Sequence, residues 1–326
     1  MSVILAGMAS SHAYAFTDPT EWEARRERTR NRYKAKFGTL PPEVPAIENE
    51  TLEENLSRFK LIQGGFARLK ADLEAFEPDV LIMVGDDQDE LYRDQTPQFA
   101  IFTGEKFVSV NRDGNDGFRN VYRNDSALAN HLYRSCLDQA IDVVGIRAFA
   151  GDELISHAHA QIMSYLDPKV PVIPLFVNAI HVPAPSPARC YAFGQAIRVA
   201  LAAWPSPLRV ACYASGGLSH FSAGFPYEAY TGPYQVGSIA EDVDRRIVGW
   251  LQAGRNAKLG ELSSSDLLNN GLVELRQWVT LMGILGDRKP AWIVYDAFYR
   301  AIMGLSVAFW APFDLSAEAR GVAGVA

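Results

Sequence analysis

Runs of apolar residues that end abruptly in glycine or polar residues constrain the fold of this chain most. Residues 80–84 are all apolar, and Gly85 and five polar residues follow them directly. A strand of this kind is covered on both faces, as in a parallel sheet with helices outside. Stretches with the helical spacing of apolar residues lie between such runs, so the sequence predicts an α/β fold with a mostly parallel central sheet flanked by helices. The other runs lie at 3–7, 143–148, 170–177 and 208–214, and the intervening helical stretches at 125–140, 157–166 and 187–203.

A longer helical stretch separates the first two predicted strands. Thr51 and Glu54 have the spacing of a capping box, in which each side chain bonds the other residue's backbone amide, and a helical stripe of apolar residues follows. Prolines between residues 41 and 45 separate this helix from an earlier one. No linker-like tract divides the chain. We therefore expect a single domain, residues 1–326, with a helical insertion at 19–75.

The composition disfavours several classes of protein. The formal charge of −7 argues against nucleic-acid binding, because phosphate contacts need a basic surface. No run reaches about 18 apolar residues, so we expect no membrane span. The N-terminus lacks the basic residues of a signal peptide. Cys136, Cys190 and Cys212 show no metal-binding spacing, and we expect reduced, buried thiols in a cytoplasmic protein.

Polar residues gather directly after the predicted strands, where ligands bind in open α/β sheets. Five of the six histidines lie in such segments, and His131 is the exception. Because histidine is the commonest metal ligand and proton carrier near pH 7, this distribution indicates a shared metal or acid–base site. The five are His12, His157, His159, His181 and His220, and the same segments carry Asp87, Gln88 and Asn178.

Glu274 lies in a mostly apolar helix predicted at 267–285, which Gly271 interrupts. A carboxylate there is costly to bury unless it is paired or binds a metal; a surface position or a pair with Arg276 also agrees with the sequence. The two glycines before His220 would let the backbone approach a ligand closely, and an ordinary turn is the alternative. The glycine spacings of nucleotide-binding loops and the GxSxG motif of serine hydrolases are absent.

Five motifs together carry a family resemblance. They are SSH after the first strand, GDDQ after the strand at 80–84, VNxxxxPxPxPxRCYAFGxAIR from Val177, GGLSHF, and VELRQW. This set resembles the class III extradiol ring-cleaving dioxygenases, and among them the protocatechuate 4,5-dioxygenase catalytic β chain and the gallate and methylgallate dioxygenases. The similarity extends from residue 1 to about 310 and is weakest over the insertion at 19–75.

The resemblance implies roles for individual residues. His12 and Glu274 match ligands of an Fe(II) ion. His220 matches the base that takes a proton from the substrate hydroxyl. His157 matches a second acid–base histidine, and the neighbouring His159 is the alternative for that position. The expected substrate-binding residues are His159, Asn178, His181 and Asp87.

One position departs from the family pattern. Where the family has its second iron-ligating histidine, this sequence has Gln88. An amide oxygen can bind a divalent metal, but more weakly than an imidazole nitrogen does. Gln88 is therefore a candidate third ligand, and a site that holds metal poorly or not at all is another outcome. The other candidates for the third ligand are Asp86, Asp87, His157 and His159.

The expected function is that of a non-haem Fe(II) dioxygenase, which cleaves a catechol-type ring beside the diol with O2. His220 would take the hydroxyl proton, and His157 would protonate the departing oxygen. A metal-dependent hydrolase or lyase is the alternative, because oxygen ligation through Gln88 suits Mn or Zn nearly as well as Fe(II). A protein that kept the scaffold and lost the metal is a third hypothesis. The expected partners are a small aromatic diol, O2 and a second copy of the chain in a homodimer.

The helical insertion carries a basic run at 25–34. Acidic residues within and before the run predict an ordinary solvated helix face. Two functional roles are also open: the insertion could form a lid or replace the contacts of a separate small subunit, and its basic run could attract a substrate carboxylate.

Overall fold

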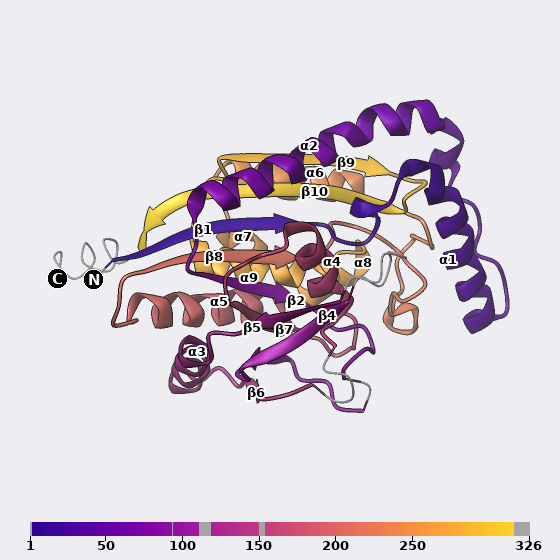
Figure 1. Ribbon diagram of the computed structural model, residues 1–326. Helices are drawn as coiled ribbons and strands as arrows, with labels where there is room; N and C mark the ends of the chain where they lie inside the picture. The colour runs from indigo at the N-terminus through magenta and orange to yellow at the C-terminus, as the bar shows by residue number, and fades with distance from the viewer. Residues whose placement is uncertain (1, 93, 111–118, 150–153, 316–326) are drawn as a thin grey trace.

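The computed structural model describes residues 2–92, 94–110, 119–149 and 154–315. Its centre is an eight-stranded sheet (Figure 1). In spatial order the strands are β6 (Val144–Ile146), β3 (Phe99–Phe102), β7 (Val172–Val177), β2 (Val80–Gly85), β8 (Leu208–Ser215), β1 (Val3–Ser10), β10 (Met303–Asp314) and β9 (Trp292–Phe298).

The middle of the sheet is parallel. Strands β7, β2, β8 and β1 all pair in parallel, whereas β3 and β10 run antiparallel to their neighbours β7 and β1. The mostly parallel sheet and the strands expected from the apolar runs are confirmed. The sequence pattern missed β3, β9, β10 and a separate hairpin of β4 (Lys106–Val110) and β5 (Arg119–Arg123).

Side chains from alternate positions along the strands enter two hydrophobic cores, one on each face of the sheet. On β2, for example, Ile82 belongs to one core and Leu81 to the other. The first core is closed by α3 (Ser126–Asp138), α5 (Pro187–Ala202), α6 (Glu241–Gln252), α7 (Ala257–Gly260), α8 (Ser264–Asn269) and α9 (Leu275–Leu285). The second is closed by α2 (Leu52–Phe76), α4 (His157–Leu166), the hairpin, and Trp22 at the start of α1 (Trp22–Phe37).

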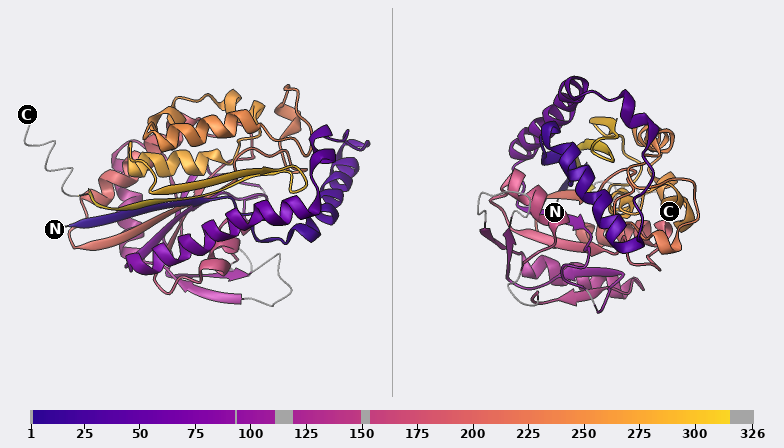
Figure 2. Two further views of the ribbon diagram at one scale, coloured as in Figure 1. Left: turned by 90° about the horizontal axis from the view of Figure 1, so that it is seen from above. Right: turned by 90° about the vertical axis from the view of Figure 1, so that its right-hand side faces the viewer.

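Helices fill most of the segment at 19–75, as expected. Thr51 and Glu54 form the predicted capping box at the start of α2. The long helix α2 packs against β9 and β10, and α1 lies across the end of the sheet toward which β1 runs (Figure 2). Since ligands bind at this end of a parallel sheet, α1 stands next to the candidate site.

The helix predicted at 267–285 is two helices. It breaks after α8, and Gly271 takes a left-handed conformation with φ of +65°, which glycine adopts without strain. Glu274 is then the N-cap residue that immediately precedes α9, and it does not lie within a continuous helix. This break points the Glu274 side chain out of the helix start and toward the strand ends.

The other expectations from composition concern the cysteines and the membrane. Cys136, Cys190 and Cys212 are free and buried, as expected. Among the described residues, none of the helices combines the length and apolarity needed to cross a membrane.

Candidate metal centre

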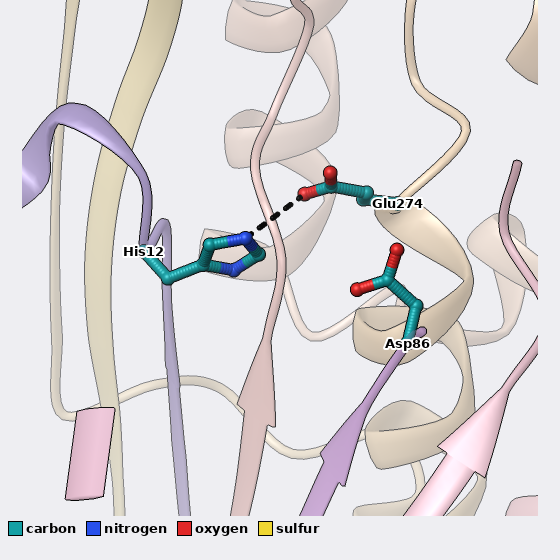
Figure 3. Close-up of side chains that lie close together, drawn as sticks. All are labelled: His12, Asp86 and Glu274. Carbon is teal, nitrogen blue, oxygen red and sulfur yellow. Dashed lines mark ion pairs between the residues drawn. The ribbon is translucent and has the colours of Figure 1, made fainter. Parts of the chain in front are cut away.

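Three side chains from distant parts of the chain meet at the carboxyl end of the sheet. His12 follows β1, Asp86 follows β2 directly, and Glu274 immediately precedes α9. Strand β8 lies between β1 and β2 in the parallel block, so their carboxyl ends open at one edge. Figure 3 shows the imidazole of His12 and the two carboxylates turned toward a common point.

The spacing of these three groups suits a metal ion. One ligand atom from each of His12, Asp86 and Glu274 lies within 4.8 Å of the other two. The Nε2 atom of His12 is 4.0 Å from Oε2 of Glu274. All three side chains are almost fully buried, with 1%, 0% and 2% of their surface exposed. An imidazole and two carboxylates are ligands that Fe(II), Mn and Zn all accept.

The two carboxylates differ in their charge state. Burial, followed by the neighbouring Glu274 charge, raises the pKa of Asp86 well above its ordinary value. Burial acts in the same direction on Glu274, but His220 and His12 outweigh it and hold the pKa of Glu274 well below the usual range. Oδ1 of Asp86 is buried and has no hydrogen-bond partner among the described residues. Because buried carboxylates are paired or bind metals, the donor set fits a divalent cation.

A hydrogen bond at Nδ1, on the side of the ring away from the carboxylates, fixes the tautomer of His12. The Ser215 hydroxyl donates its only hydrogen to the Ala158 carbonyl, so at 3.2 Å it can only accept a hydrogen bond from Nδ1–H of His12. The unprotonated Nε2 of His12 therefore faces the carboxylates. Burial lowers the pKa of His12 to about 4, which keeps the ring neutral near pH 7. A neutral imidazole with a free Nε2 lone pair is the form that binds metals.

Backbone contacts hold Glu274 in place. Oε2 of Glu274 accepts a hydrogen bond from the Gly217 amide at 2.9 Å. The Glu274 carbonyl oxygen passes so close to Gly216 that a Cβ atom there would lie 2.7 Å from it. Gly216 therefore permits the close approach of two backbone segments. The expected close approach to a ligand stays a prediction.

Gln88 lies between the two carboxylates. Its Nε2 atom donates to Oδ2 of Asp86 at 3.1 Å and to Oε1 of Glu274 at 2.8 Å. The amide nitrogen, and not the amide oxygen, therefore faces the cluster in this structure. Asp86, one of the alternatives for the missing ligand, is the residue that joins His12 and Glu274.

His220 completes one side of the cluster. Its Nδ1–H donates to the Leu218 carbonyl at 3.0 Å, and its Nε2 atom is 3.3 Å from Oε1 of Glu274. Burial alone would lower the pKa of His220, but the Glu274 carboxylate outweighs it and raises the pKa to about 9. His220 can therefore hold a proton directly beside the candidate ligands.

His157 lies beside His12. Its ring centre is 5.1 Å from that of His12, and its side chain is 22% exposed. Glu90 accepts hydrogen bonds from its backbone amide at 2.9 Å and from its Nδ1 atom at 3.0 Å. Burial acts to lower the pKa of His157, but Glu90 reverses the effect and raises it to about 9. The Glu90 carboxylate thus both orients the His157 ring and stabilises its protonated form.

The remaining predicted residues do not join the cluster. His159 is fully buried behind it, where Nδ1 contacts the Ser156 hydroxyl and Nε2 donates to the Leu175 carbonyl. Asp87 accepts three backbone amide hydrogen bonds, from residues 90–92, and so shapes the loop after β2. Asn178 and His181 bond each other across a turn. With Asp87 they surround a cavity of only about 10 Å³, room for about one water molecule.

Two residues gained roles that the sequence pattern did not assign. Glu90 orients His157, and Ser215 sets the tautomer of His12. Both stand in the polar segments directly after predicted strands, so their position was the available signal. The residues that they contact, His157 and His12, belong to other segments of the chain, and the sequence pattern does not show which segments lie side by side.

A family model described as the catalytic LigB subunit of aromatic ring-opening dioxygenase matches residues 41–310. The match includes Asp86, His157, His220 and Glu274, and it begins after His12. A 2,3-dihydroxyphenylpropionate/2,3-dihydroxicinnamic acid 1,2-dioxygenase from Burkholderia vietnamiensis is 30% identical over 277 residues, which cover 71% of this chain and 82% of the relative.

Two further relatives match over shorter segments. A gallate dioxygenase from Pseudomonas putida is 35% identical over 100 residues, 29% of this chain and 28% of the relative. A 2,3-dihydroxyphenylpropionate/2,3-dihydroxicinnamic acid 1,2-dioxygenase from Rhodococcus globerulus is 28% identical over 163 residues, 49% of each chain. The chain therefore spans about half or less of the length of these two proteins.

Proposed function

This chain belongs to the family of catalytic LigB subunits of aromatic ring-opening dioxygenases, and from that premise we propose that it cleaves a catechol-type ring beside the diol, with O2 and an Fe(II) ion. The observation that carries the proposal is the buried cluster of His12, Asp86 and Glu274, with ligand atoms within 4.8 Å of one another. His220, next to Glu274, and His157, next to His12, supply two groups that can move protons.

We assign the metal ligands to His12, Asp86 and Glu274. Gln88, the sequence candidate for the third ligand, orients the two carboxylates through its amide nitrogen in this assignment. Bound Fe(II) would supply the redox chemistry between the aromatic diol and O2. The contribution of the chain is to hold the diol, to keep water out of a buried site and to control two protons.

His220 is the proposed base. Its Nδ1–H is committed to the Leu218 carbonyl, which leaves Nε2 as the atom that accepts the proton of a diol hydroxyl. The Glu274 carboxylate is the main group that raises the pKa of His220. A cation bound by Glu274 would weaken that support and leave Nε2 available as a base.

His157 is the proposed acid. Glu90 holds its Nδ1 atom and raises its pKa to about 9, so the ring is protonated near neutral pH. The other ring nitrogen can then give a proton to the oxygen atom from O2 that is released when the O–O bond breaks. An acid and a base next to one cluster meet the two proton-transfer needs of ring cleavage.

The test is reconstitution with Fe(II) under anaerobic conditions, followed by addition of O2 and protocatechuate, gallate, methylgallate or 2,3-dihydroxyphenylpropionate. We expect one equivalent of iron per chain, uptake of O2 and a yellow ring-cleavage product with at least one diol. Absence of O2 uptake with all four would remove the proposal for these substrates. Turnover of a substrate without O2 would instead favour the metal-dependent hydrolase or lyase, for which the relatives give no support.

A further inference from the structure

Asp244 is a buried carboxylate outside the candidate metal centre. It lies in the first turn of α6, and none of its surface is exposed. Its Oδ1 atom accepts a hydrogen bond from the Ser219 amide at 3.0 Å, and its Oδ2 atom accepts one from the Ser219 hydroxyl at 2.7 Å. The Tyr295 hydroxyl, on β9, donates a third at 2.9 Å. Because a buried carboxylate is costly without such donors, Asp244 and Ser219 hold each other in place.

Ser219 is the residue directly before His220, and all of its polar groups are bonded. Besides its two bonds to Asp244, its hydroxyl accepts a hydrogen bond from the Ala240 amide at 2.8 Å. Its carbonyl accepts one from the Gly304 amide at 3.0 Å. These contacts fix the position of Ser219 between α6 and the start of β10.

The direction of the His220 ring depends on the same short segment. Its Nδ1–H donates to the Leu218 carbonyl, on the other side of Ser219 in the chain. The amide of His220 donates to the Gly271 carbonyl at 2.9 Å. A Cβ atom on Gly217 would lie 3.0 Å from Nδ1 of His220, so the ring also packs against that glycine. Ser219 thus lies between the two residues whose contact orients the ring, and a shift of Ser219 would move both.

The segment 217–220 contacts Glu274 at both of its ends. The Gly217 amide donates to Oε2 of Glu274, and Nε2 of His220 lies 3.3 Å from Oε1. The distance between the proposed base and a proposed metal ligand is therefore set by a segment that Asp244 holds at its third residue. A general base acts only within hydrogen-bond reach of the proton that it takes, and a misplacement of about 1 Å can lower a rate about 100-fold.

We propose that Asp244 is a positioning residue, which holds the His220 ring beside the metal centre through Ser219. The inference rests on the proposed function, because it takes His220 to be the base that accepts the proton of a diol hydroxyl. The role of Asp244 differs from that of Glu90. Glu90 bonds the His157 ring directly, whereas Asp244 bonds the backbone and the side chain of the residue before the ring.

Two variants break the contact between Asp244 and Ser219. In Asp244→Asn only one side-chain oxygen is left to accept, so at least one of the two bonds from Ser219 is lost. Ser219→Ala removes the hydroxyl and changes no charge. Tyr295→Phe is the matched control, because it removes a hydrogen bond to the same carboxylate and leaves both bonds between Asp244 and Ser219 in place.

The first readout is the NMR signal of the His220 ring in the full chain with isotopically labelled histidine. The chain has six histidines, and the signal that is lost in His220→Gln identifies the one from His220. We expect this signal to shift in Asp244→Asn and in Ser219→Ala and to stay in place in Tyr295→Phe. A residue that served stability alone would change the free energy of unfolding and leave the His220 signal in place.

The second readout is O2 uptake by the Fe(II)-loaded protein with a diol that the parent protein turns over. We expect kcat to fall about 10- to 100-fold in Asp244→Asn and Ser219→Ala, because a displaced base slows the proton transfer. KM should change less than about twofold, since the base acts in the chemical step and not in binding the diol. Tyr295→Phe should keep the kcat of the parent protein.

An unshifted His220 signal in both variants would overturn the inference. So would an equal shift in Tyr295→Phe, because the path through Ser219 would then have no special part, and so would a shifted signal with unchanged kcat. The two proposals fail separately. O2 uptake by the parent protein with an unshifted signal leaves the ring-cleavage function and removes the positioning role. A shifted signal in a protein that takes up no O2 with any diol removes the function and leaves Asp244 as the residue that holds this ring.

Discussion

The Ser215 hydroxyl accepts a hydrogen bond from Nδ1 of His12 at 3.2 Å, because its own hydrogen is donated to the Ala158 carbonyl. This contact turns the unprotonated Nε2 of His12 toward Asp86 and Glu274. A serine at the end of one strand thus selects the tautomer of a histidine that follows the neighbouring strand. Such contacts behind a ligand orient the ring and raise its basicity.

Ser215→Ala should therefore weaken metal binding about 10- to 100-fold, the usual effect of losing such a contact. Titration of the purified protein with Fe(II) against a competing chelator measures the change. Ser10→Ala is the matched control, since Ser10 pairs with Ser215 in register on β1 and its hydroxyl bonds Tyr213 and not His12. Equal losses in the two variants would show that the tautomer of His12 is not set by Ser215.

The two candidates for the third metal ligand, Asp86 and Gln88, can be distinguished by the metal affinities of their variants. If Asp86 binds the metal, Asp86→Asn should lower the affinity by more than about 100-fold, beyond the usual effect of a residue behind a ligand. Gln88→Ala removes only hydrogen bonds to the two carboxylates and should cost about tenfold or less. The same chelator competition distinguishes them. A larger loss for Gln88→Ala than for Asp86→Asn would make the amide the ligand.

The strands at the centre of the sheet were predictable because burial on both faces leaves a continuous apolar run. Leu81 and Ile82 of β2 enter opposite cores, and both are fully buried. The missed strands lack this signature. Five of the seven residues of β9 are partly exposed. The long apolar run of β10 does not by itself distinguish a strand from a buried helix. The expected single domain and homodimer stay predictions.

Candidate site residues could be found from the sequence, but their partners could not. His12 and Asp86 follow β1 and β2, which are not neighbours. Both strands pair in parallel with β8, which lies between them, and their carboxyl ends therefore open at the same edge. Likewise, His157 and His159 stand two residues apart on α4 and so point in nearly opposite directions. The packing of α4 decides that His157 lies beside His12 while His159 lies behind the cluster.

Asp244 gives a stability prediction that depends on pH. It is fully buried, accepts hydrogen bonds from the amide and hydroxyl of Ser219 and from Tyr295, and burial raises its pKa to about 7. Because the folded state holds this proton more tightly than the unfolded state, stability should fall as the pH rises from about 4 to 7. Over this range the free energy of unfolding should fall by about 4 kcal/mol, at about 1.4 kcal/mol for each pH unit.

Asp244→Asn should remove this dependence. The free energy of unfolding of the variant, measured in urea between pH 4 and 8, should rise relative to the parent protein as the pH increases. Asp242→Asn, at an exposed position of the same helix, is the control and should run parallel to the parent protein. Parallel curves for Asp244→Asn as well would contradict a raised pKa at this carboxyl.

Gly216→Ala should damage the metal centre through the backbone. The added Cβ atom would lie 2.7 Å from the Glu274 carbonyl oxygen and 3.3 Å from the Glu274 Cβ, so one of the two backbone segments must shift, and we expect the Glu274 carboxylate to be displaced. Displacing a metal ligand should weaken metal binding at least as much as removing a side chain that supports the ligand, so we expect the metal affinity to fall at least about tenfold. Overpacking should also lower the free energy of unfolding by about 1–3 kcal/mol. Gly64→Ala, in α2, is the control. Nothing lies within 4 Å of its added Cβ atom, so the variant should leave metal affinity unchanged and raise stability slightly.

Chelator competition and urea unfolding of both variants measure the changes in metal affinity and in stability. Unchanged metal affinity in Gly216→Ala would mean that the position of Glu274 does not depend on this close contact.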